Sequence, residues 1–535
     1  MSPGTPDLHC DVAVVGGGLG GIYTAYRLRA AGFSVVGIEG APDFGGVWYH
    51  NAYPGARVDT ESVDYCFLFS NEVYAGWRWS ERYCAQPEVL AYLHWVADQL
   101  AVRPLFRFDN WLTSTQWSSD ERRWNLVTDR GLAVSAQFVV MCTGNLSEPK
   151  PIPFPGLDRF GGEWHSANRW PHTEVPLTDR RIAVVGTGSS GIQIVPEVAE
   201  VAQHVFVFQR TPHYVIPTSN PGPDGDVQGA IAARLAEHRE DEFTKPTRPR
   251  GLADLQPLDY YSAAERIAML EAQWKRGGHG IAYLFADIAT NWETNEFVSE
   301  FVRSKIRHIL NDRALAEKLV PAYPIGTRRL CVDVSGYYEC LNQIHVQHVD
   351  MRATPIVELT EAGIRTTDAE YEVDLIIFAL GFKPFLGSIN RAGVRDEAGR
   401  SPADVWSRGP RTVFGLMTPG FPNFFHPTNA GSPSVLAPLF VVNEFHGDWI
   451  TELLVSMRDR GYETVQATDE GADAWGAKSA AVAERMIRRQ VDNYMVHVNA
   501  DDGSRIFQPW GAGMATYVPE VRAMTANDYE GLAFA

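Results

Sequence analysis

The amino-acid sequence predicts an α/β fold with two doubly wound units and a helical insertion. The prediction rests on two segments, DVAVVGGGLGGIYTAYRL and RIAVVGTGSSGIQIVPEV, each of which places a glycine-rich turn between a short apolar run and a helical pattern. The glycines at the spacing G-x-G-x-x-G are Gly16, Gly18 and Gly21 in the first segment and Gly186, Gly188 and Gly191 in the second. Two such turns in strand–turn–helix context indicate two Rossmann-like dinucleotide-binding domains, so the chain is predicted to hold two nucleotides at once.

The composition indicates a large folded protein. The chain has 535 residues, of which 45% are hydrophobic, and this length corresponds to about two to four domains. The net charge is −18 and no long basic run occurs, which argues against nucleic acid or an anionic membrane as a partner. No apolar run reaches about eighteen residues, so we expect no membrane-spanning helix. The opening MSPGTPDLHC lacks a basic stretch followed by an apolar core, so no secretion signal is expected. The sequence gives no sign of an obligate protein partner.

The six cysteines predict a reduced, cytoplasmic protein. None of them forms a CxxC pair, and several lie in apolar runs such as FVVMCTG. We therefore expect thiols that are mostly buried. They are Cys10, Cys66, Cys84, Cys142, Cys331 and Cys340. No cluster of histidine, cysteine and carboxylate residues has metal-ligand spacing, so no metal is predicted.

The first unit begins with a strand at 11–15, followed by the glycine turn, a helix and a strand at 34–39. Glu39 ends that second strand, where a carboxylate can accept hydrogen bonds from an adenosine ribose and favours FAD or NAD over NADP. The alternative is a solvated acid at a strand end. A further apolar strand is expected at 137–144, and residues 145–156, with four prolines, predict a linker.

The second unit begins near Arg181, and its second strand is expected at 204–210. Arg210 and Thr211 stand near the place that Glu39 has in the first unit. A guanidinium there suits a 2′-phosphate, and a charge-assisted pair contributes roughly 1.5–3 kcal/mol. That energy corresponds to a preference for NADP over NAD of roughly tenfold to a hundredfold or more. The alternative is an ordinary surface arginine.

A helical stretch and a returning strand complete the predicted organisation. Residues 263–275 and 297–310 show apolar spacing near 3.6, so 222–320 is expected to be a helical insert. The run YEVDLIIFALGF at 371–382 predicts a strand. The expected division is an FAD-binding domain at 1–148 and 385–535, an NADP-binding domain at 149–221 and 321–384, and the insert at 222–320. We expect the chemistry in the cleft between the two domains.

The segment from Gly45 to Asp59 follows soon after Glu39. Its paired glycines allow the backbone to approach a cofactor closely. Trp48 and Tyr53 can form walls for a flat ring, and Asp59 lies beyond a Pro-Gly turn. A purely structural loop is the alternative.

With these residues the chain resembles the type I Baeyer–Villiger monooxygenases, a family of FAD- and NADPH-dependent flavoproteins. The resemblance covers most of the chain outside 215–320 and the last 80 residues. Besides the segment 45–59, the similar segments are 79–100, GTGSSGIQ at 186–193, FQRTPHY at 208–214, YPIGTRRL at 323–330, 409–425 and GSPS at 431–434. Together these motifs are highly specific.

Three departures from the family pattern are visible. The fingerprint Phe-x-Gly-x-x-x-His-x-x-x-Trp-Pro matches at 160–171 except that the histidine, His165, is one position early and Ser166 takes its place. Leu380 replaces the threonine of the second Ala-Thr-Gly element. Residues 494–499, YMVHVN, stand where the family usually has Trp-x-x-Gly-Ala-Asn, a loop that borders substrate and nicotinamide in relatives. The altered loop is compatible with a bulky ketone, such as a polycyclic natural product.

The resemblance implies that NADPH reduces FAD and that reduced flavin and O2 form a C4a-peroxyflavin. This species would insert one oxygen atom into a ketone to give an ester or lactone. Arg329 matches the catalytic arginine of the family, and Asp59 matches the acid that pairs with it. The implied cofactor-binding residues are Gly16, Gly18, Gly21, Glu39, Gly46, Val47, Trp48 and Asp59 for FAD, and Gly186, Thr187, Gly188, Ser189, Ser190, Gln193, Arg210, Thr211 and Arg328 for NADP.

Two other functions stay open at this point. One is a flavin monooxygenase that oxidises nitrogen or sulfur atoms, or an NADPH oxidase-like flavoprotein that releases hydrogen peroxide. The other is a catalytically inactive redox-sensing or binding protein. The presence of Arg329, Asp59 and both glycine turns argues against the second.

Overall fold

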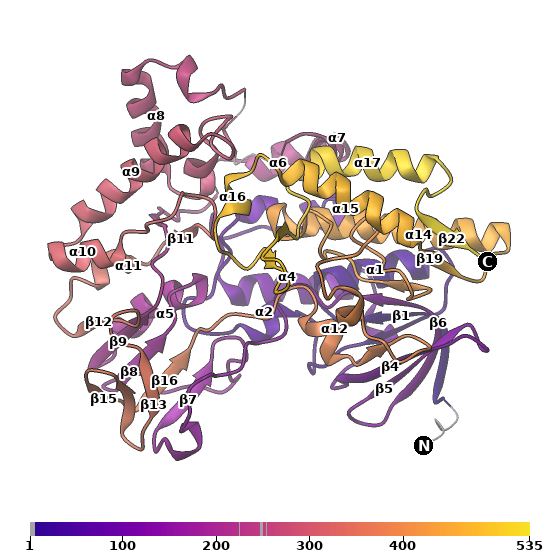
Figure 1. Ribbon diagram of the computed structural model, residues 1–535, viewed down its shortest axis with the longest axis horizontal. Coiled ribbons are helices and arrows are strands. Elements are labelled where there is room, and N and C mark those ends of the chain that lie inside the picture. Colours follow the sequence, from indigo (N-terminus) through magenta and orange to yellow (C-terminus); the bar gives the residue numbers. More distant parts are fainter. Residues whose placement is uncertain (1–5, 224, 247–249, 253) are drawn as a thin grey trace.

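The computed structural model describes residues 6–223, 225–246, 250–252 and 254–535. Residues 1–5, half of the segment considered for a secretion signal, lie outside this range. The molecule is a mixed α/β protein in which two main sheets lie side by side along the long axis (Figure 1). The predicted fold class is confirmed.

The first sheet has the strand order β17-β4-β5-β6-β1-β2-β3, and β18 pairs with β6. Its centre is parallel, because β1 pairs in parallel with both β6 and β2, whereas β4, β5 and β6 are joined by antiparallel pairs. The strands are β1 Leu8–Val15, β2 Val35–Ile38, β3 Phe106–Arg107, β4 Leu112–Ser118, β5 Arg123–Thr128, β6 Ala133–Met141, β17 Val394–Arg395 and β18 Phe424–Phe425. The predicted strand at 137–144 therefore begins earlier and ends before Cys142.

The second sheet has the order β12-β9-β8-β16-β7, with every pair parallel. Its strands are β7 Glu163–Ser166, β8 Arg181–Val185, β9 His204–Gln209, β12 Val346–Asp350 and β16 Leu375–Phe378. The three central strands, β8, β9 and β16, are rich in buried Val, Ile, Leu or Phe, as expected for a parallel sheet covered on both faces. The strands of the first sheet lie within 8–141 and 394–425, and those of the second sheet lie within 163–378.

The predicted strand at 371–382 is wrong in its extent, because two short strands replace it. β15 (Glu370–Glu372) belongs to an antiparallel sheet with β13 (Ile356–Leu359) and β14 (Gly363–Thr366), whereas β16 lies in the second main sheet. Asp374 separates the two strands, and its carboxylate accepts hydrogen bonds from the backbone and guanidinium of Arg181. The remaining strands are β10 Val215–Pro217, β11 Cys331–Asp333, β19 Val465–Ala467, β20 Val496–Val498, β21 Arg505–Phe507 and β22 Leu532–Phe534.

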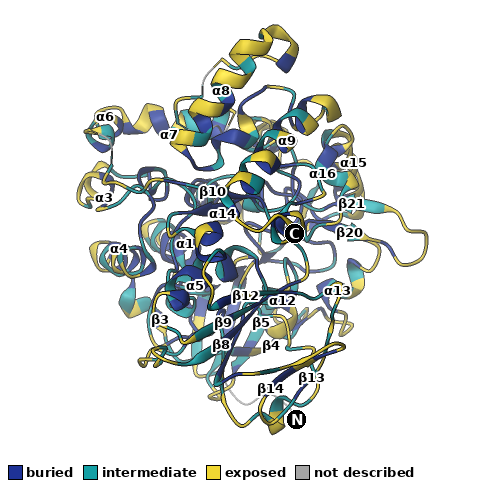
Figure 2. Ribbon diagram, turned by 90° about the vertical axis from the view of Figure 1, so that its left-hand side faces the viewer, coloured by how far each residue is buried: buried dark blue, intermediate teal, exposed yellow. Residues whose placement is uncertain are grey.

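The helical stretch predicted at 222–320 contains α6 Val227–Ala232, α7 Leu235–Thr244, α8 Ala263–Arg276, α9 Trp292–Ile309 and α10 Arg313–Leu319. It is divided between two cores. Ile231, Leu235 and Phe243 pack in the core of the first unit, whereas the buried residues of α8 to α10 pack with the second unit. Helix α8 projects from the molecule and is largely exposed (Figure 2).

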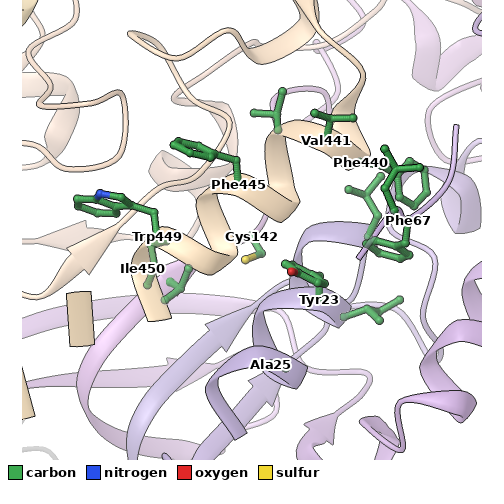
Figure 3. Packing of buried hydrophobic residues seen from close by; sticks show 14 of the residues in the cluster. Tyr23, Ala25, Phe67, Cys142, Phe440, Val441, Phe445, Trp449 and Ile450 are labelled. Atoms are coloured by element: carbon green, nitrogen blue, oxygen red, sulfur yellow. The ribbon is translucent and has the colours of Figure 1, made fainter. Parts of the chain in front are cut away.

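The helices of the first unit surround a large aromatic core. Helix α14 packs along α1, and the ring of Tyr23 in α1 stacks on Phe67, which in turn contacts Phe440 of α14 (Figure 3). The other helices are α1 Leu19–Ala30, α2 Val47–His50, α3 Asn71–Ala75, α4 Gln86–Gln99, α5 Ser189–Ala199, α11 Tyr337–Cys340, α12 Gly387–Arg391, α13 Pro402–Val405, α14 Leu439–Arg460, α15 Asp469–Ala483, α16 Ile487–Gln490 and α17 Met514–Ala526. In the part of the chain that the structure describes, no helix has the length and apolar character that crossing a bilayer requires.

Candidate active site and nucleotide sites

The two glycine turns have the same geometry. Gly16 follows β1 with φ +107° and Gly186 follows β8 with φ +109°. A Cβ built on either residue would lie 2.5 Å from a carbonyl oxygen, that of Cys142 for Gly16 and that of Ala379 for Gly186. Both the backbone angle and the contact therefore require glycine. The sequence repeat is thus a structural repeat, with each turn packed against the end of the neighbouring parallel strand.

The helix that follows each turn begins without a capping side chain. Gly18 is the N-cap of α1 and Gly188 the N-cap of α5, and neither first turn contains an acidic residue. The first backbone N–H groups of a helix have no partner inside the helix and attract anions, so both ends suit the phosphates of a dinucleotide. A Cβ on Gly188 would meet no atom within 4 Å, and Ser189 and Ser190 open the helix beside this space. These features fit FAD at the first turn and NADP at the second.

Glu39 directly adjoins the first turn. Its side chain is buried at 5% exposure, which excludes a freely solvated acid. One carboxylate oxygen accepts a 2.7 Å hydrogen bond from the Ala41 backbone, and the other accepts one from the Gly17 backbone. Burial raises the pKa of Glu39, although these N–H groups oppose the shift. The carboxylate lies where the sequence predicts a ribose contact.

Arg210 is exposed immediately after β9, beside the second turn. Thr187 of that turn donates to the Thr211 carbonyl at 3.4 Å, so the turn and the segment that carries Arg210 are in contact. Arg352 donates to the Thr211 hydroxyl, also at 3.4 Å. Arg210 and Arg352 therefore both follow strands that end at this edge of the second sheet, and the Arg352 guanidinium contacts Thr211.

The segment predicted to approach the flavin folds back onto the first turn. Gly46 has φ +54°, and a Cβ on it would lie 3.0 Å from the Cα of Gly18. Helix α2 begins at Val47, and the Trp48 indole N–H donates to the Tyr65 hydroxyl at 3.0 Å. The buried side-chain oxygen of Asn51 has no hydrogen-bond partner in the structure. An unpaired acceptor at this place fits a ligand with a donor group.

Gln193 of α5 joins the two units. Its side-chain oxygen accepts a 2.9 Å hydrogen bond from the Tyr53 hydroxyl, and its amide nitrogen donates to the Arg57 carbonyl at 3.1 Å. Gln193 was predicted as an NADP-binding residue, and here it holds the 53–57 segment against the second unit. Ser189, at the start of the same helix, lies 3.7 Å from the Cys331 sulfur.

Arg329 and Asp59, 270 residues apart in the sequence, form an ion pair. The Arg329 Nε donates to Asp59 Oδ2 at 3.0 Å, and Nη2 donates to the same oxygen. Burial alone would raise the pKa of Asp59, but the charge of Arg329 outweighs it and the pKa is lowered. Burial acts to lower the pKa of Arg329, and Asp59 raises it overall. Both side chains therefore stay charged.

Arg328 precedes Arg329 in the chain, and His279 contacts the residue that follows it, Leu330. The Arg328 guanidinium lies over the Tyr323 ring at 5.2 Å, and its buried Nε has no hydrogen-bond partner. The His279 Nε2 is 3.2 Å from the Leu330 carbonyl oxygen. Burial lowers the pKa of His279, so this imidazole stays neutral beside the charged pair.

The displaced histidine of the fingerprint makes a local contact. His165 lies in β7 and bonds to Glu163 of the same strand at 2.7 Å. The Trp170 backbone N–H donates to the His50 carbonyl of α2 at 3.0 Å. The end of the fingerprint, rather than the histidine, therefore connects the second unit to residues 45–59, which we call the flavin segment.

Three side chains at the site were not found by sequence reasoning: His279, Arg352 and Arg488. His279 lies in the helical stretch and Arg488 in the C-terminal part of the chain, and both contact residues 323–330, the segment that carries Arg329. No local motif in the sequence marks either of them. Arg352 had a usable signal, because it follows a strand that ends at the same sheet edge as β9. Among the residues placed by the structure, no group of His, Cys, Asp and Glu can hold a metal ion, and the six cysteines are free and buried.

The chain is similar to known monooxygenases over almost its whole length. Residues 10–237 match the pyridine nucleotide-disulphide oxidoreductase family. A Baeyer–Villiger monooxygenase of Pseudooceanicola batsensis is 33% identical over 98% of this chain and 96% of its own length. A phenazine N-monooxygenase of Lysobacter antibioticus is 32% identical over 98% and 96%.

Solved structures of monooxygenases are also similar to this chain. A steroid monooxygenase in its oxidized form, bound to NADP, is 39% identical and superposes with a TM-score of 0.91 over 98% of this chain and 99% of that one. OTEMO in complex with FAD and NADP is 33% identical, with a TM-score of 0.92 over 99% and 100%.

The fold, the site and these matches together define an FAD- and NADP-dependent monooxygenase. The chain belongs to the Baeyer–Villiger monooxygenase family, which confirms the resemblance found in its motifs.

Proposed function

We propose that this protein inserts one oxygen atom of O2 into a ketone and that Arg329 and Asp59 are the residues on which the insertion depends. Bound FAD supplies the activation of O2, with electrons from NADPH. The protein orients the cofactors and the ketone and stabilises the charge that develops during the reaction. The observation that carries the proposal is the ion pair between Arg329 and Asp59, which lies where the flavin segment of the first unit meets the second unit.

Arg329 provides a fixed positive charge. Its guanidinium stays protonated at every working pH, and Asp59 engages Nε and Nη2, so the Nη1 side is not used by the pair. A donor aimed at oxygen where negative charge develops contributes about 2.7–4 kcal/mol, or a hundred- to a thousandfold in rate. Asp59 holds the guanidinium in one orientation and keeps it from turning toward other acceptors.

The second site is proposed to select NADPH. Arg210 and Thr211 lie at the sheet edge beside the uncapped start of α5, where a 2′-phosphate meets a guanidinium and a hydroxyl. Arg328 offers a third donor, because its buried Nε is unpaired. The helix start itself is suited to the pyrophosphate.

The substrate is proposed to be a bulky, polycyclic ketone. The support is the altered 494–499 loop, together with the similarity to a steroid monooxygenase at 39% identity. The small-molecule substrate and O2 are the partners that this chemistry requires.

A second candidate is oxidation of an aromatic ring nitrogen. The relative from Lysobacter antibioticus, a phenazine N-monooxygenase, matches this chain about as well as the ketone-oxygenating relative does. Product analysis separates the two, because only ketone oxygenation gives esters or lactones.

The decisive test is Arg329→Ala assayed with cyclic, aromatic and steroid ketones. We expect the variant to bind FAD and to oxidise NADPH while ester and lactone formation is lost. Arg365→Ala, which removes an exposed arginine between Glu358 and Glu370, is the matched control and should retain product formation. Normal lactone formation by Arg329→Ala would remove Arg329 from the mechanism. N-oxide products with no ester from any ketone would favour the second candidate.

A further inference from the structure

The segment that carries Arg329 is held in place by side chains from other elements. Residues 323–330 contain no helix or strand, yet several of their carbonyl oxygens accept a hydrogen bond from outside the segment. The donors are Tyr214 to Tyr323 at 2.8 Å, Asn295 to Ile325 at 3.0 Å, Arg488 to Gly326 and His279 to Leu330 at 3.2 Å. The position of Arg329 is therefore set by these donors rather than by a regular element.

Arg488 binds this segment through two N–H groups. Its Nε donates to the Gly326 carbonyl at 2.8 Å, and its Nη2 donates to the same oxygen. Gly326 has φ +76° and stands three residues before Arg329, in a turn closed by Thr327 and Pro324. A guanidinium that offers two N–H groups to one carbonyl fixes both the position and the direction of that peptide.

Arg488 is itself well anchored. It lies in α16, and the backbone N–H of the preceding Ile487 donates to Ala289 of the helical stretch at 3.0 Å. The Asn493 side chain donates to the Arg488 carbonyl at 3.0 Å. Arg488 thus connects the C-terminal part of the chain, just before the altered 494–499 loop, to the Arg329 segment.

The charges around Arg488 also point to the active site. Burial lowers the pKa of Arg488, and the groups that act on it further are Tyr283, Tyr494 and Arg329. None of these is a carboxylate. A cation brought close to Arg329 costs free energy, so a contact made only for stability would be better served by an uncharged donor.

We propose that Arg488 is a positioning residue for Arg329: by binding the Gly326 carbonyl through two N–H groups, it fixes the 323–330 segment so that the Arg329 guanidinium stays beside Asp59. The proposal rests on the proposed role of Arg329 in oxygen insertion. It makes Arg488 a determinant of coupling, the fraction of consumed NADPH that appears as oxygenated product, because a displaced Arg329 leaves NADPH oxidation intact and impairs insertion.

The test compares Arg488→Met, Arg488→Lys and the control Arg489→Met in the FAD-loaded enzyme. Arg489 is the neighbouring arginine and donates to the Arg505 carbonyl at 3.4 Å, away from the Arg329 segment. Two readouts are measured: amide hydrogen exchange of peptides covering 323–331, which requires no ketone, and the ratio of ester to hydrogen peroxide per NADPH.

We expect Arg488→Met to exchange tenfold or more faster in 323–331 and to lose coupling severalfold, with a melting temperature near that of the wild type. Arg488→Lys retains a donor but cannot offer two N–H groups in the same geometry, so its exchange and its coupling should lie between those of the wild type and Arg488→Met. Arg489→Met should match the wild type in both readouts. A merely structural role would lower the melting temperature without changing the coupling ratio, and that result overturns the proposal.

The outcome is decided even if Arg488→Met is insoluble. Wild-type exchange and wild-type coupling in Arg488→Lys would then contradict the proposal, whereas faster exchange with reduced coupling supports it. Failure of the proposed function gives a different result, because the wild type itself would then form no ester from any ketone while the exchange readout still reports on the segment.

Discussion

Replacement of Asp59 by alanine is the sharpest perturbation of the site. The variant removes the only carboxylate that Arg329 bonds to in the described chain, and it deletes both the Nε and the Nη2 contact. The expected effect is a guanidinium that keeps its charge and loses its orientation. Asp59→Asn separates the two contributions, since an amide oxygen can still accept hydrogen bonds but carries no charge.

The size of the effect follows from the exposure of the pair. Loss of one partner costs about 3–5 kcal/mol in a buried ion pair, whereas an exposed pair contributes about 0–1 kcal/mol. The Asp59 side chain is 22% exposed and that of Arg329 is 37% exposed, so solvent screens the pair in part. We expect that Asp59→Ala removes about 1–3 kcal/mol of the free energy that holds Arg329 in its orientation. If this loss appears in full in the activation barrier, oxygen insertion slows roughly 5- to 150-fold.

The assay is ester formation under saturating NADPH and ketone, with bound flavin measured by its absorbance. The rate of ester formation should decrease by a factor within that range in Asp59→Ala and by a smaller factor in Asp59→Asn. Glu372→Ala removes a 69%-exposed partner of Arg181 and serves as the control, with a change below about twofold. Wild-type ester formation by a flavin-loaded Asp59→Ala variant would refute the reasoning.

Three further predictions follow from the structure. Gly188→Ala should fold normally, because a Cβ there meets no atom within 4 Å, yet it should weaken NADPH binding in a titration; unchanged binding would argue against a phosphate at the start of α5. Arg210→Ala should raise the KM for NADPH roughly tenfold to a hundredfold more than that for NADH, and an equal rise for both would exclude a 2′-phosphate contact. Burial lowers the pKa of His446 to about 3, so below about pH 6.5 only the unfolded chain takes up this proton. The free energy of unfolding should therefore fall as the pH decreases from about 6.5 toward 3, by about 1.4 kcal/mol per pH unit from this residue. Urea titrations at several pH values should show that the free energy of unfolding depends less steeply on pH in His446→Gln than in the wild type, and an equal dependence would contradict the role of His446.

The local features of the nucleotide sites could be predicted from the sequence. Gly16 and Gly186 are required by backbone geometry within a few residues of each turn, and the apolar runs before them are long enough to specify buried strands. The extent of a strand was predicted less accurately where it depends on contacts with a distant part of the chain. The run at 371–382 looks continuous, but Asp374 is held by Arg181 and splits it into strands of two different sheets.

The sequence by itself determined the two dinucleotide turns, the kinds of side chain at the site and the family, because each is encoded within short segments whose spacing is set by strand and helix geometry. Only the tertiary structure decided how Arg329 is held. Its ion pair spans 270 residues, and the carbonyl oxygens around it are bound by His279 and Arg488 from distant parts of the chain. Contacts of this kind leave no periodic or local pattern, since they form only when separately folded elements pack together.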